Sequence, residues 1–413
     1  MAIKTIGTDS APSILAAQGI RAYLADMDAN ATNELIALPG QNMDAVRDYE
    51  TRRRQATDNL ITAAQNITFG KSERDPIVTL ANGLANYERS MTQARDFHER
   101  GDPAMLAAYR QADDILHKTL LPAVDALDKV NNDSLTTAYA AQKTGATVTS
   151  ALTMLAGLLL LSALIVTQLF LFRRMRRLIN PVLLVATVLT VLYLLHTLTS
   201  FHSVGSHLKT AKEDAFDSVR ALWLTRATAF DANADESRWL LDRTLAGDYE
   251  KAFQSKSALI AAPPAGNSAA SVAEGYLNDH TNQKNNTFKG FLADELNNIT
   301  FPGEKEAAVS TLQAWGRYLG IDAKLRALEN AGKHKEAIAL CIGNDPGKSN
   351  WAYTQFDDAL DKTLKINQTE FDLNINEATN ILQPFDIINP LALIIVVALA
   401  FAGMWPRMRE YAF

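Results

Sequence analysis

The chain has 413 residues, of which 47% are hydrophobic and 21% are charged, and its formal net charge is −6. This modest negative charge gives no support to a nucleic-acid partner, which would require a basic face. The single cysteine, Cys341, excludes an intramolecular disulfide. We expect it to be a small buried side chain, with an intermolecular bridge as the alternative.

The first part of the chain shows four helical patterns with breaks between them, and no strand pattern. The first is amphipathic and the next two are charged on one side and apolar on the other, and Pro122 is expected to kink the last one. The patterns cover Asp9–Pro39, Asn42–Thr68, Ser72–Arg100 and a helix that begins near Ala104, after the break Gly101-Asp102-Pro103. Residues 1–149 are therefore predicted to form an extracytoplasmic up-down four-helix bundle.

Residues 150–200 read as a membrane hairpin. Ala151–Phe172 is uncharged and Pro181–Ser200 is similarly apolar, and about 20 apolar residues cross a bilayer as a helix. The loop 173–180 between them contains Arg173, Arg174, Arg176 and Arg177. Such an arginine-rich loop is typical of the cytoplasmic side, so we expect it to be the cytoplasmic relay loop.

Residues 201–386 are predicted to form a second extracytoplasmic helical bundle. The apolar segment continues as a helix to about Leu245, and a Pro- and Ala-rich loop follows at 261–270. Further helices are expected over Glu304–Ala331, Lys335–Cys341 and Trp351–Leu382. Residues 387–405 are a third span with Trp405 at its interface, and residues 406–413 form a cytoplasmic tail.

Two local matches indicate that the chain is a tandem repeat. The motif Asp28-Ala-Asn-Ala31 recurs as Asp231-Ala-Asn-Ala234, a shift of 203 residues. Tyr109, Gln111, Asp113, Asp114, Leu116, Lys118, Thr119 and Leu120 recur in the same order from Tyr353 to Leu364, a shift of 244 residues. The second copy therefore has about 41 extra residues, and we expect them in the Pro- and Ala-rich loop and the polar stretch after it.

The repeat raises the hypothesis that a first span is missing. In the second copy the span Pro181–Ser200 precedes the first helix directly, and Met1 aligns with Val204, just past that span. Both bundles also belong on the extracytoplasmic side, which the arginine-rich loop implies. We therefore expect the natural protein to have four spans, of which three are visible here.

We find no catalytic constellation, and we expect neither an enzyme nor a metal or cofactor site. Gly343–Ser349 resembles a phosphate-binding loop, but it has three residues between its glycines where a Walker A loop has four. It is better explained as a turn between helices. The seven histidines show no metal spacing, and His196 lies within a span, where we expect interhelical hydrogen bonding, with a signalling role as the alternative.

The polar residues shared by the two copies are the candidate site. Tyr and Asp at positions i and i+4 share one face of a helix. We expect these residues to tie first and last helices together, with a small-ligand pocket or a docking site as the alternatives. The candidates are Asp28, Asn30, Tyr109, Asp113, Asp231, Asn233, Glu236, Arg238, Tyr353 and Asp357.

Two family resemblances follow from these motifs. The order of span, long-helix bundle and span resembles the four-helix-bundle sensor modules of chemoreceptors and sensor kinases, and Ile6–Ile14 is similar to the first helix of such modules. Asp231-Ala-Asn-Ala-Asp-Glu-Ser-Arg-Trp-Leu-Leu-Asp242, with the tandem architecture, resembles the actinobacterial multi-pass protein that accompanies a glutamate/glutamine-binding lipoprotein and a soluble Ser/Thr kinase. The missing first span departs from that pattern.

We therefore predict an all-α integral membrane protein of the plasma (inner) membrane, a possible homo-oligomer, that senses a solute or a loaded binding protein outside and signals to a separate effector inside. The resemblance implies a solute-binding protein and a Ser/Thr kinase as partners. A structural or assembly scaffold of the cell envelope is the alternative. Transport is a weaker third reading, because apart from His196 the spans lack ionisable residues for a substrate path.

Overall fold

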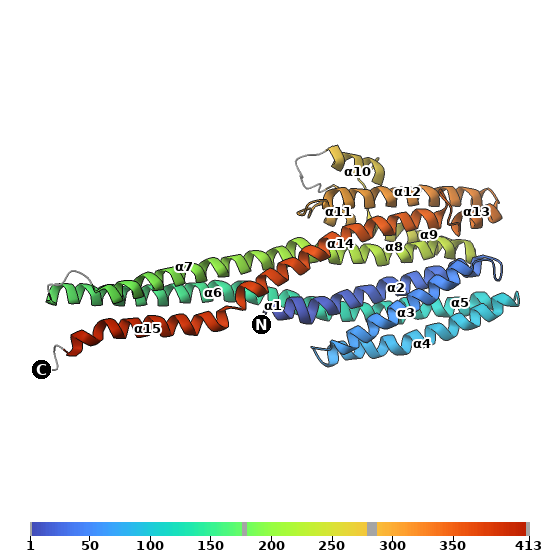
Figure 1. Ribbon diagram of the computed structural model, residues 1–413. Coiled ribbons are helices and arrows are strands. Elements are labelled where there is room, and N and C mark those ends of the chain that lie inside the picture. The colour runs from blue at the N-terminus through green and yellow to red at the C-terminus, as the bar shows by residue number, and fades with distance from the viewer. Residues whose placement is uncertain (1, 176–179, 279–286, 410–413) are drawn as a thin grey trace. The chain divides into compact units, whose positions relative to one another are not determined.

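The computed structural model describes residues 2–175, 180–278 and 287–409 (Figure 1). It is 87% helical, and no strand occurs in these ranges. The predicted all-α class is confirmed. Three helical stretches are long and apolar enough, by length and composition, to cross a membrane: Ala104–Arg173, Pro181–Leu241 and Ser349–Pro406.

The chain divides into two compact units. The first unit comprises Met1–Lys4, Thr136–Lys212 and Asp372–Phe413, and the second comprises Thr5–Leu135 and Glu213–Phe371. The boundary between them falls inside three helical segments, which are α6 (Leu121–Met175), the π-helical segment η3 (Thr210–Phe216) and α14 (Ser349–Leu382). The same helices therefore contribute residues to both units.

The second unit contains the predicted helices with small shifts at their ends, and it also contains a helix over Ala246–Ile260 that no sequence pattern predicted. Its N-terminal helices are η1 (Thr5–Ser10), α2 (Ala11–Ile36), α3 (Met43–Gln65), α4 (Lys71–Glu99), α5 (Ala104–Ile115) and η2 (Leu116–Leu120). Asp102 caps α5 by accepting a hydrogen bond from the Ala104 amide at 2.9 Å. The π-helical turn η2 lies directly before Pro122, which is where the sequence predicted a kink.

The C-terminal helices of this unit begin with α8 (Asp217–Leu241), the counterpart of α2 in the sequence repeat. They continue with α9 (Ala246–Ile260), α10 (Ala269–Asn278), α11 (Phe291–Leu296), α12 (Glu304–Asn330), α13 (His334–Cys341) and the first part of α14. Residues 279–286 of the predicted polar stretch lie outside the described residues. A core of aromatic side chains fills the space between α8, α12 and α14, with Trp315 and Phe356 at a ring distance of 5.0 Å.

The first helix of the N-terminal bundle is buried far more completely than predicted. An amphipathic helix was expected, but residues on all sides of α2 are buried, including Ala17, Ala22, Leu24 and Met27. The reason is that α2 packs both against α3 and against α8 (Figure 1). Alanines occupy many of its buried positions, and such small side chains allow neighbouring helices to approach closely.

Two asparagines make matching sets of hydrogen bonds in this unit. Asn66, after α3, donates to the Asp9 carbonyl at 2.9 Å and to the Ser13 hydroxyl at 2.7 Å. Asn298, after α11, donates to the Asp214 carbonyl at 2.9 Å and to the Ser218 hydroxyl at 3.0 Å. Each asparagine therefore fastens a loop to the π-helical turn that precedes α2 or α8.

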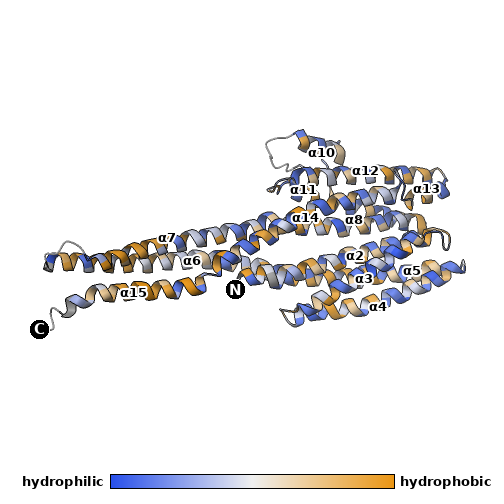
Figure 2. Cartoon of the chain, in the orientation of Figure 1, coloured by the Kyte–Doolittle hydropathy of each residue, from blue (hydrophilic) through white to orange (hydrophobic). Residues whose placement is uncertain are grey.

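The first unit consists of α6, α7 (Pro181–Lys209) and α15 (Phe385–Arg409), together with the ends of the flanking helices. Hydrophobic residues dominate α6, α7 and α15 (Figure 2). The α6 and α7 helices are joined by a hydrogen bond of 2.9 Å from Gln168 to Thr187, and Leu194 occupies the space beside Gly157. Asn180 donates to the Gly403 carbonyl of α15 at 2.7 Å.

His196 lies against α15 in this unit. Its ring stacks on Phe385 at a centroid distance of 5.6 Å, and Phe385 also stacks on Phe201 at 5.9 Å. One turn away, Tyr193 donates to Asn389 at 2.7 Å. These contacts join α7 to α15.

Candidate functional site: a buried ion cluster between helices α2, α5 and α8

Arg238 of α8 is the centre of a buried polar cluster in the second unit. Its side chain is 1% exposed, so its charge must be compensated by protein groups. One terminal nitrogen donates to Asp28 of α2 at 2.5 Å, and Nε donates to the Tyr109 hydroxyl of α5 at 2.9 Å. The other terminal nitrogen lies 2.5 Å from Asp235 and 3.2 Å from Asp231. A single guanidinium therefore connects α2, α5 and α8.

Tyrosine hydroxyls complete the shell around Asp28. Tyr87 of α4 donates to one carboxylate oxygen at 2.8 Å, and Tyr109 donates to the other at 3.2 Å. Burial is the main cause, and the carboxylate of Asp28 the second, that raises the pKa of Tyr87 well above its ordinary value. The hydroxyl therefore remains protonated and available as a donor.

A histidine and a lysine complete the cluster on its other side. His117 lies 3.0 Å from Asp113 through Nδ1 and 3.2 Å from Asp231 through Nε2. Lys256 of α9 lies 2.8 Å from Asp231 and 2.6 Å from Asp235. Four carboxylates thus surround three basic groups, which are Arg238, His117 and Lys256.

The pKa values follow from this arrangement. Burial by itself lowers the pKa of His117, but hydrogen bonds to Asp113 and Asp231 outweigh it and raise that pKa to about 10. Burial raises the pKa of Asp231, but Lys256 and His117 outweigh it and hold that pKa well below its ordinary value. At neutral pH His117 is therefore a cation that bridges two helices.

The predicted residues on the last helix of the C-terminal copy, Tyr353 and Asp357, lie in different surroundings. Asp357 of α14 forms a bidentate pair with Arg226, with distances of 2.6 and 2.9 Å. The Tyr353 ring packs on Phe230 at a centroid distance of 5.1 Å, and its buried hydroxyl has no hydrogen-bond partner within the described ranges. Tyr109 and Tyr353 therefore match in sequence but not in their hydrogen bonds.

Three further predicted residues lie outside the Arg238 cluster. Asn30 donates to the carboxylate of Asp26 at 2.8 Å, and Asn233 donates to the Tyr318 hydroxyl at 3.3 Å. Glu236 accepts a hydrogen bond from Ser349 at 2.6 Å. Burial and the neighbouring carboxylate of Asp322 raise the pKa of Glu236 to about 8.

Five of the ten predicted site residues meet in the cluster, namely Asp28, Tyr109, Asp113, Asp231 and Arg238. Sequence reasoning missed Tyr87, His117, Asp235 and Lys256. A signal was available for Asp235, which lies four residues after Asp231 and three before Arg238 and so shares their helix face. No spacing in the sequence links Tyr87 or Lys256 to the cluster.

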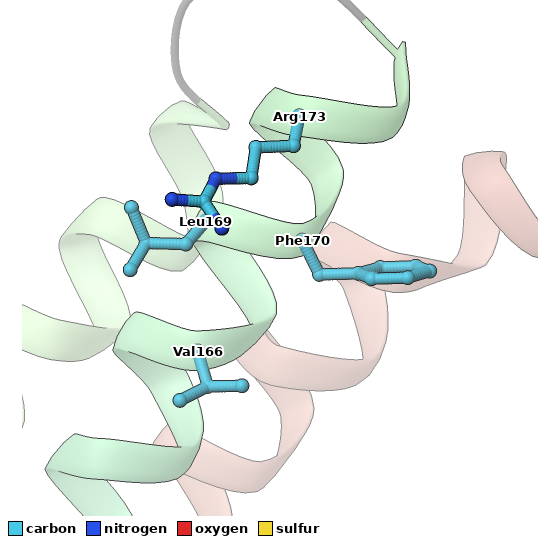
Figure 3. Close-up of a pocket in the computed structure, with 4 residues that line it drawn as sticks. All are labelled: Val166, Leu169, Phe170 and Arg173. Carbon is cyan, nitrogen blue, oxygen red and sulfur yellow. The ribbon is translucent and has the colours of Figure 1, made fainter.

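The predicted relay loop is only partly described. Arg176 and Arg177 lie outside the described residues, as does the side chain of Arg174. Arg173 lies at the end of α6 beside a shallow hollow of about 460 Å³ that is also lined by Val166, Leu169 and Phe170 (Figure 3). No group of three or more metal-ligating side chains was found in the parts of the chain that the structure covers.

Residues 2–140 match the family model described as an actinobacterial sensor domain. This match supports an actinobacterial sensor protein and includes α2 and α5, which supply Asp28 and Tyr109. No curated protein and no solved structure matches the chain.

Proposed function

We propose that this protein is a plasma-membrane sensor that detects a solute, or a solute-loaded binding protein, outside the cytoplasm and signals to a separate cytoplasmic effector. The sensor-domain match and the three membrane-length helices fit a membrane sensor. The observation that carries the finer proposal is the Arg238 cluster. It joins helices from both halves of the chain through buried ion pairs, so a displacement of one half would disturb the other.

The proposal includes two tandem copies of one helical bundle. Asn66-Ile-Thr-Phe69 recurs as Asn298-Ile-Thr-Phe301, a shift of 232 residues. In each motif the Thr and Phe amides donate to a buried glutamate, Glu73 or Glu304, at distances between 2.5 and 2.9 Å. The shift between the copies is 203 residues at the first motif, 232 at this one and 244 at the last. The extra residues of the second copy therefore lie partly in the α10–α11 region and partly in the α13 region.

We propose that the input signal is received at a surface of the bundles and not by a ligand that binds inside the cluster. The donors of Arg238 face Asp28, Tyr109, Asp231 and Asp235 at hydrogen-bonding distance. A ligand carboxylate would have to displace one of these buried partners and leave it uncompensated, which is costly. Docking of a loaded binding protein requires no such exchange and is the form of input that we propose.

The output route follows α6, η3 and α14. These helical segments contribute residues to both units, so a small translation or rotation can pass along them. The loop with Arg173, Arg174, Arg176 and Arg177 would then offer a basic docking surface to the effector. A cytoplasmic Ser/Thr kinase is the effector class that the resemblance of residues 231–242 implies.

Purification of the tagged full-length protein from its native host tests this proposal. We expect a solute-binding lipoprotein and a kinase to co-purify, as measured by mass spectrometry. Replacing the four loop arginines by Gln should release the kinase and retain the lipoprotein, provided that accessibility labelling shows an unchanged topology. Unchanged recovery of the kinase from this variant would contradict the proposed docking surface.

The envelope-scaffold alternative has one observation in its favour, which is that the charged groups of the cluster pair with one another. Such a cluster can act as a static tie between helices. Recovery of envelope-assembly proteins alone, with no change in hydrogen exchange of α2 and α8 when the loaded binding protein is added, would favour that alternative.

A further inference from the structure

A groove of about 850 Å³ lies in the first unit, mainly between α6 and α7. Its lining includes the apolar side chains of Leu198, Phe201 and Leu208, with Lys143, Lys209 and His202 also at its wall. This volume is within the range of pockets that hold one small amphiphilic molecule. The groove thus combines an apolar floor with basic groups.

The two lysines lie at corresponding heights along the helices. Residues 144–172 of α6 contain no charged side chain, so Lys143 and Arg173 are about 45 Å apart at the helical rise of 1.5 Å per residue. This length equals the thickness of a bilayer with its headgroups, which is about 40–45 Å. On α7, residues 181–208 contain no Asp, Glu, Lys or Arg before Lys209. Both ammonium groups therefore belong at the level of lipid headgroups.

Two glycines face open space in the groove. Gly145 of α6 and Gly205 of α7 both line it, and a Cβ added at either position would meet no atom within 4 Å. By contrast, a Cβ at Gly157, deeper in the same helix pair, would lie 2.3 Å from Leu194. The helix pair is therefore closed inside the apolar segment and open at its end.

The charged residues that line the groove indicate that its ligand carries a negative charge. No aspartate or glutamate is among its lining residues. Neither the Lys143 nor the Lys209 ammonium has an ion-pair partner within the described ranges, whereas Lys129 on the same helix pairs with Asp133 at 2.6 Å. Basic pockets between membrane helices near the headgroup level suit anionic lipid headgroups.

We propose that this groove binds one anionic phospholipid. Its phosphate lies against Lys143 and Lys209, and an acyl chain lies along Leu198 and Phe201. The bound lipid fills the open end of the helix pair, at the point where α6 and α7 leave the apolar segment. This inference is independent of the identity of the input or the effector.

Native mass spectrometry of the full-length protein tests this assignment. The protein is purified in mild detergent and incubated with equal amounts of phosphatidylglycerol and phosphatidylcholine that have identical acyl chains. We expect one retained phosphatidylglycerol, preferred at least about tenfold, because each lysine near a headgroup contributes roughly a factor of five. The Lys143→Gln/Lys209→Gln variant should lose this preference, and Lys129→Gln should keep it.

A second variant tests the shape of the groove separately from its charge. Gly145→Leu/Gly205→Leu should reduce the retention of both lipids, because an added Cβ meets open space at both positions and the leucine side chains would occupy part of the groove. Thr144→Leu, at a neighbouring position outside the lining, should leave retention unchanged. All variants should keep the wild-type gel-filtration profile and melting temperature.

Three results would overturn the proposal. The first is an unchanged preference for phosphatidylglycerol in the double lysine variant. The second is retention of many lipids without preference, which indicates an ordinary lipid annulus. The third is displacement of the bound lipid by millimolar inorganic phosphate, which would identify a site for free anions.

Discussion

Arg238 differs from most charged residues of the bundles in being almost completely buried, with 1% of its side chain exposed. Surface pairs such as Arg47–Asp44, with side chains 74% and 54% exposed, contribute between 0 and about 1 kcal/mol. A buried pair adds little compared with an apolar replacement of both partners, but the loss of one partner is costly. The cluster therefore specifies how α2, α5 and α8 meet, more than it adds to stability.

Replacing Arg238 by Met should destabilise the second unit by about 3–5 kcal/mol, because Asp28 would lose its guanidinium partner and keep the Tyr87 and Tyr109 hydroxyls, and Asp235 would have to rely on Lys256. Thermal unfolding in detergent, followed by circular dichroism, measures this loss. Arg243→Met is the matched control, since the Arg243 side chain is 46% exposed and rests on Trp239. Adding Asp28→Asn and Asp235→Asn to Arg238→Met should recover part of the loss. A decrease in the free energy of unfolding below about 1 kcal/mol for Arg238→Met would refute the central role of the guanidinium.

His117 gives the cluster a defined pH dependence. Its pKa is raised from 6.5 to about 10 in the folded protein, so its stabilising contribution is complete below pH 6.5 and is lost as the pH rises through 10. His117→Gln should therefore be less stable than the wild type by about 2 kcal/mol at pH 6, and the difference should shrink towards pH 10. A difference that stays constant over this range would show that the histidine acts only through packing.

Glu295 should show the pH dependence of a buried carboxyl group. Burial is the main cause, and the charge of the adjacent Glu304 the second, that raises the pKa of Glu295 to about 8. The folded state therefore favours the protonated form. Its stabilising contribution is present below its ordinary pKa of 4.5 and is lost as the pH rises through 8. Glu295→Gln should then melt at a higher temperature than the wild type at pH 9 and at a similar one at pH 5. Glu306→Gln, on the exposed side of α12, is the control and should not change this profile.

At the scale of elements, the two halves are most similar in the loop motif that ends in a buried glutamate, Glu73 or Glu304. In both halves an asparagine reaches the π-helical turn before the first helix, and a glutamate accepts two backbone amides. These contacts fix the loop between the second and third long helices against the first helix. The same arrangement in two places supports the proposed duplication of one bundle.

This interpretation predicts similar losses for corresponding substitutions. Asn66→Ala and Asn298→Ala each remove hydrogen bonds to a buried turn, and each should cost about 1–3 kcal/mol in thermal unfolding. Asn344→Ala, at an exposed loop position whose hydrogen bond to Asp44 is 3.5 Å long, should cost little. If only one of the two asparagines matters, the shared motif does not have a shared structural role.

The helices themselves could be predicted from the sequence, because their periodicity and their breaks at Pro39-Gly40 and Gly101-Asp102-Pro103 are local signals. The contacts that α2 makes on all sides could not, since a run of alanines does not show how many neighbours approach it. The partners of Arg238 were in part predictable, because Asp231 and Arg238 share a helix. The contacts of Arg238 with Asp28 and Tyr109 depend on how α2, α5 and α8 pack, which no spacing in the sequence encodes.

At the scale of the whole molecule, α6 and α7 form a hairpin of two membrane-length helices. If both cross the membrane, the residues before α6 and those after α7 lie on the same side. The arginine-rich loop between them then lies on the opposite side, which the bias of basic loops identifies as the cytoplasm. The interhelical contacts of Arg238 require the same arrangement, because Asp28 and Arg238 come from the two ends of the hairpin.

Cysteine labelling in intact cells tests this topology. Cys341 is 0% exposed and should give no background with a membrane-impermeant maleimide. Gln93→Cys on α4 and Ala323→Cys on α12 are exposed positions in the two halves, and both should react in intact cells. Arg173→Cys should react only after the membrane is permeabilised. The chain crosses the membrane twice between the two bundles, which places them on the same side, and once between each bundle and the loop, which places the loop on the other side. Labelling of Arg173→Cys in intact cells would exclude a cytoplasmic loop, and labelling of all three positions in intact cells would exclude the hairpin. Opposite results for Gln93→Cys and Ala323→Cys would exclude a contact between Asp28 and Arg238 in the cell.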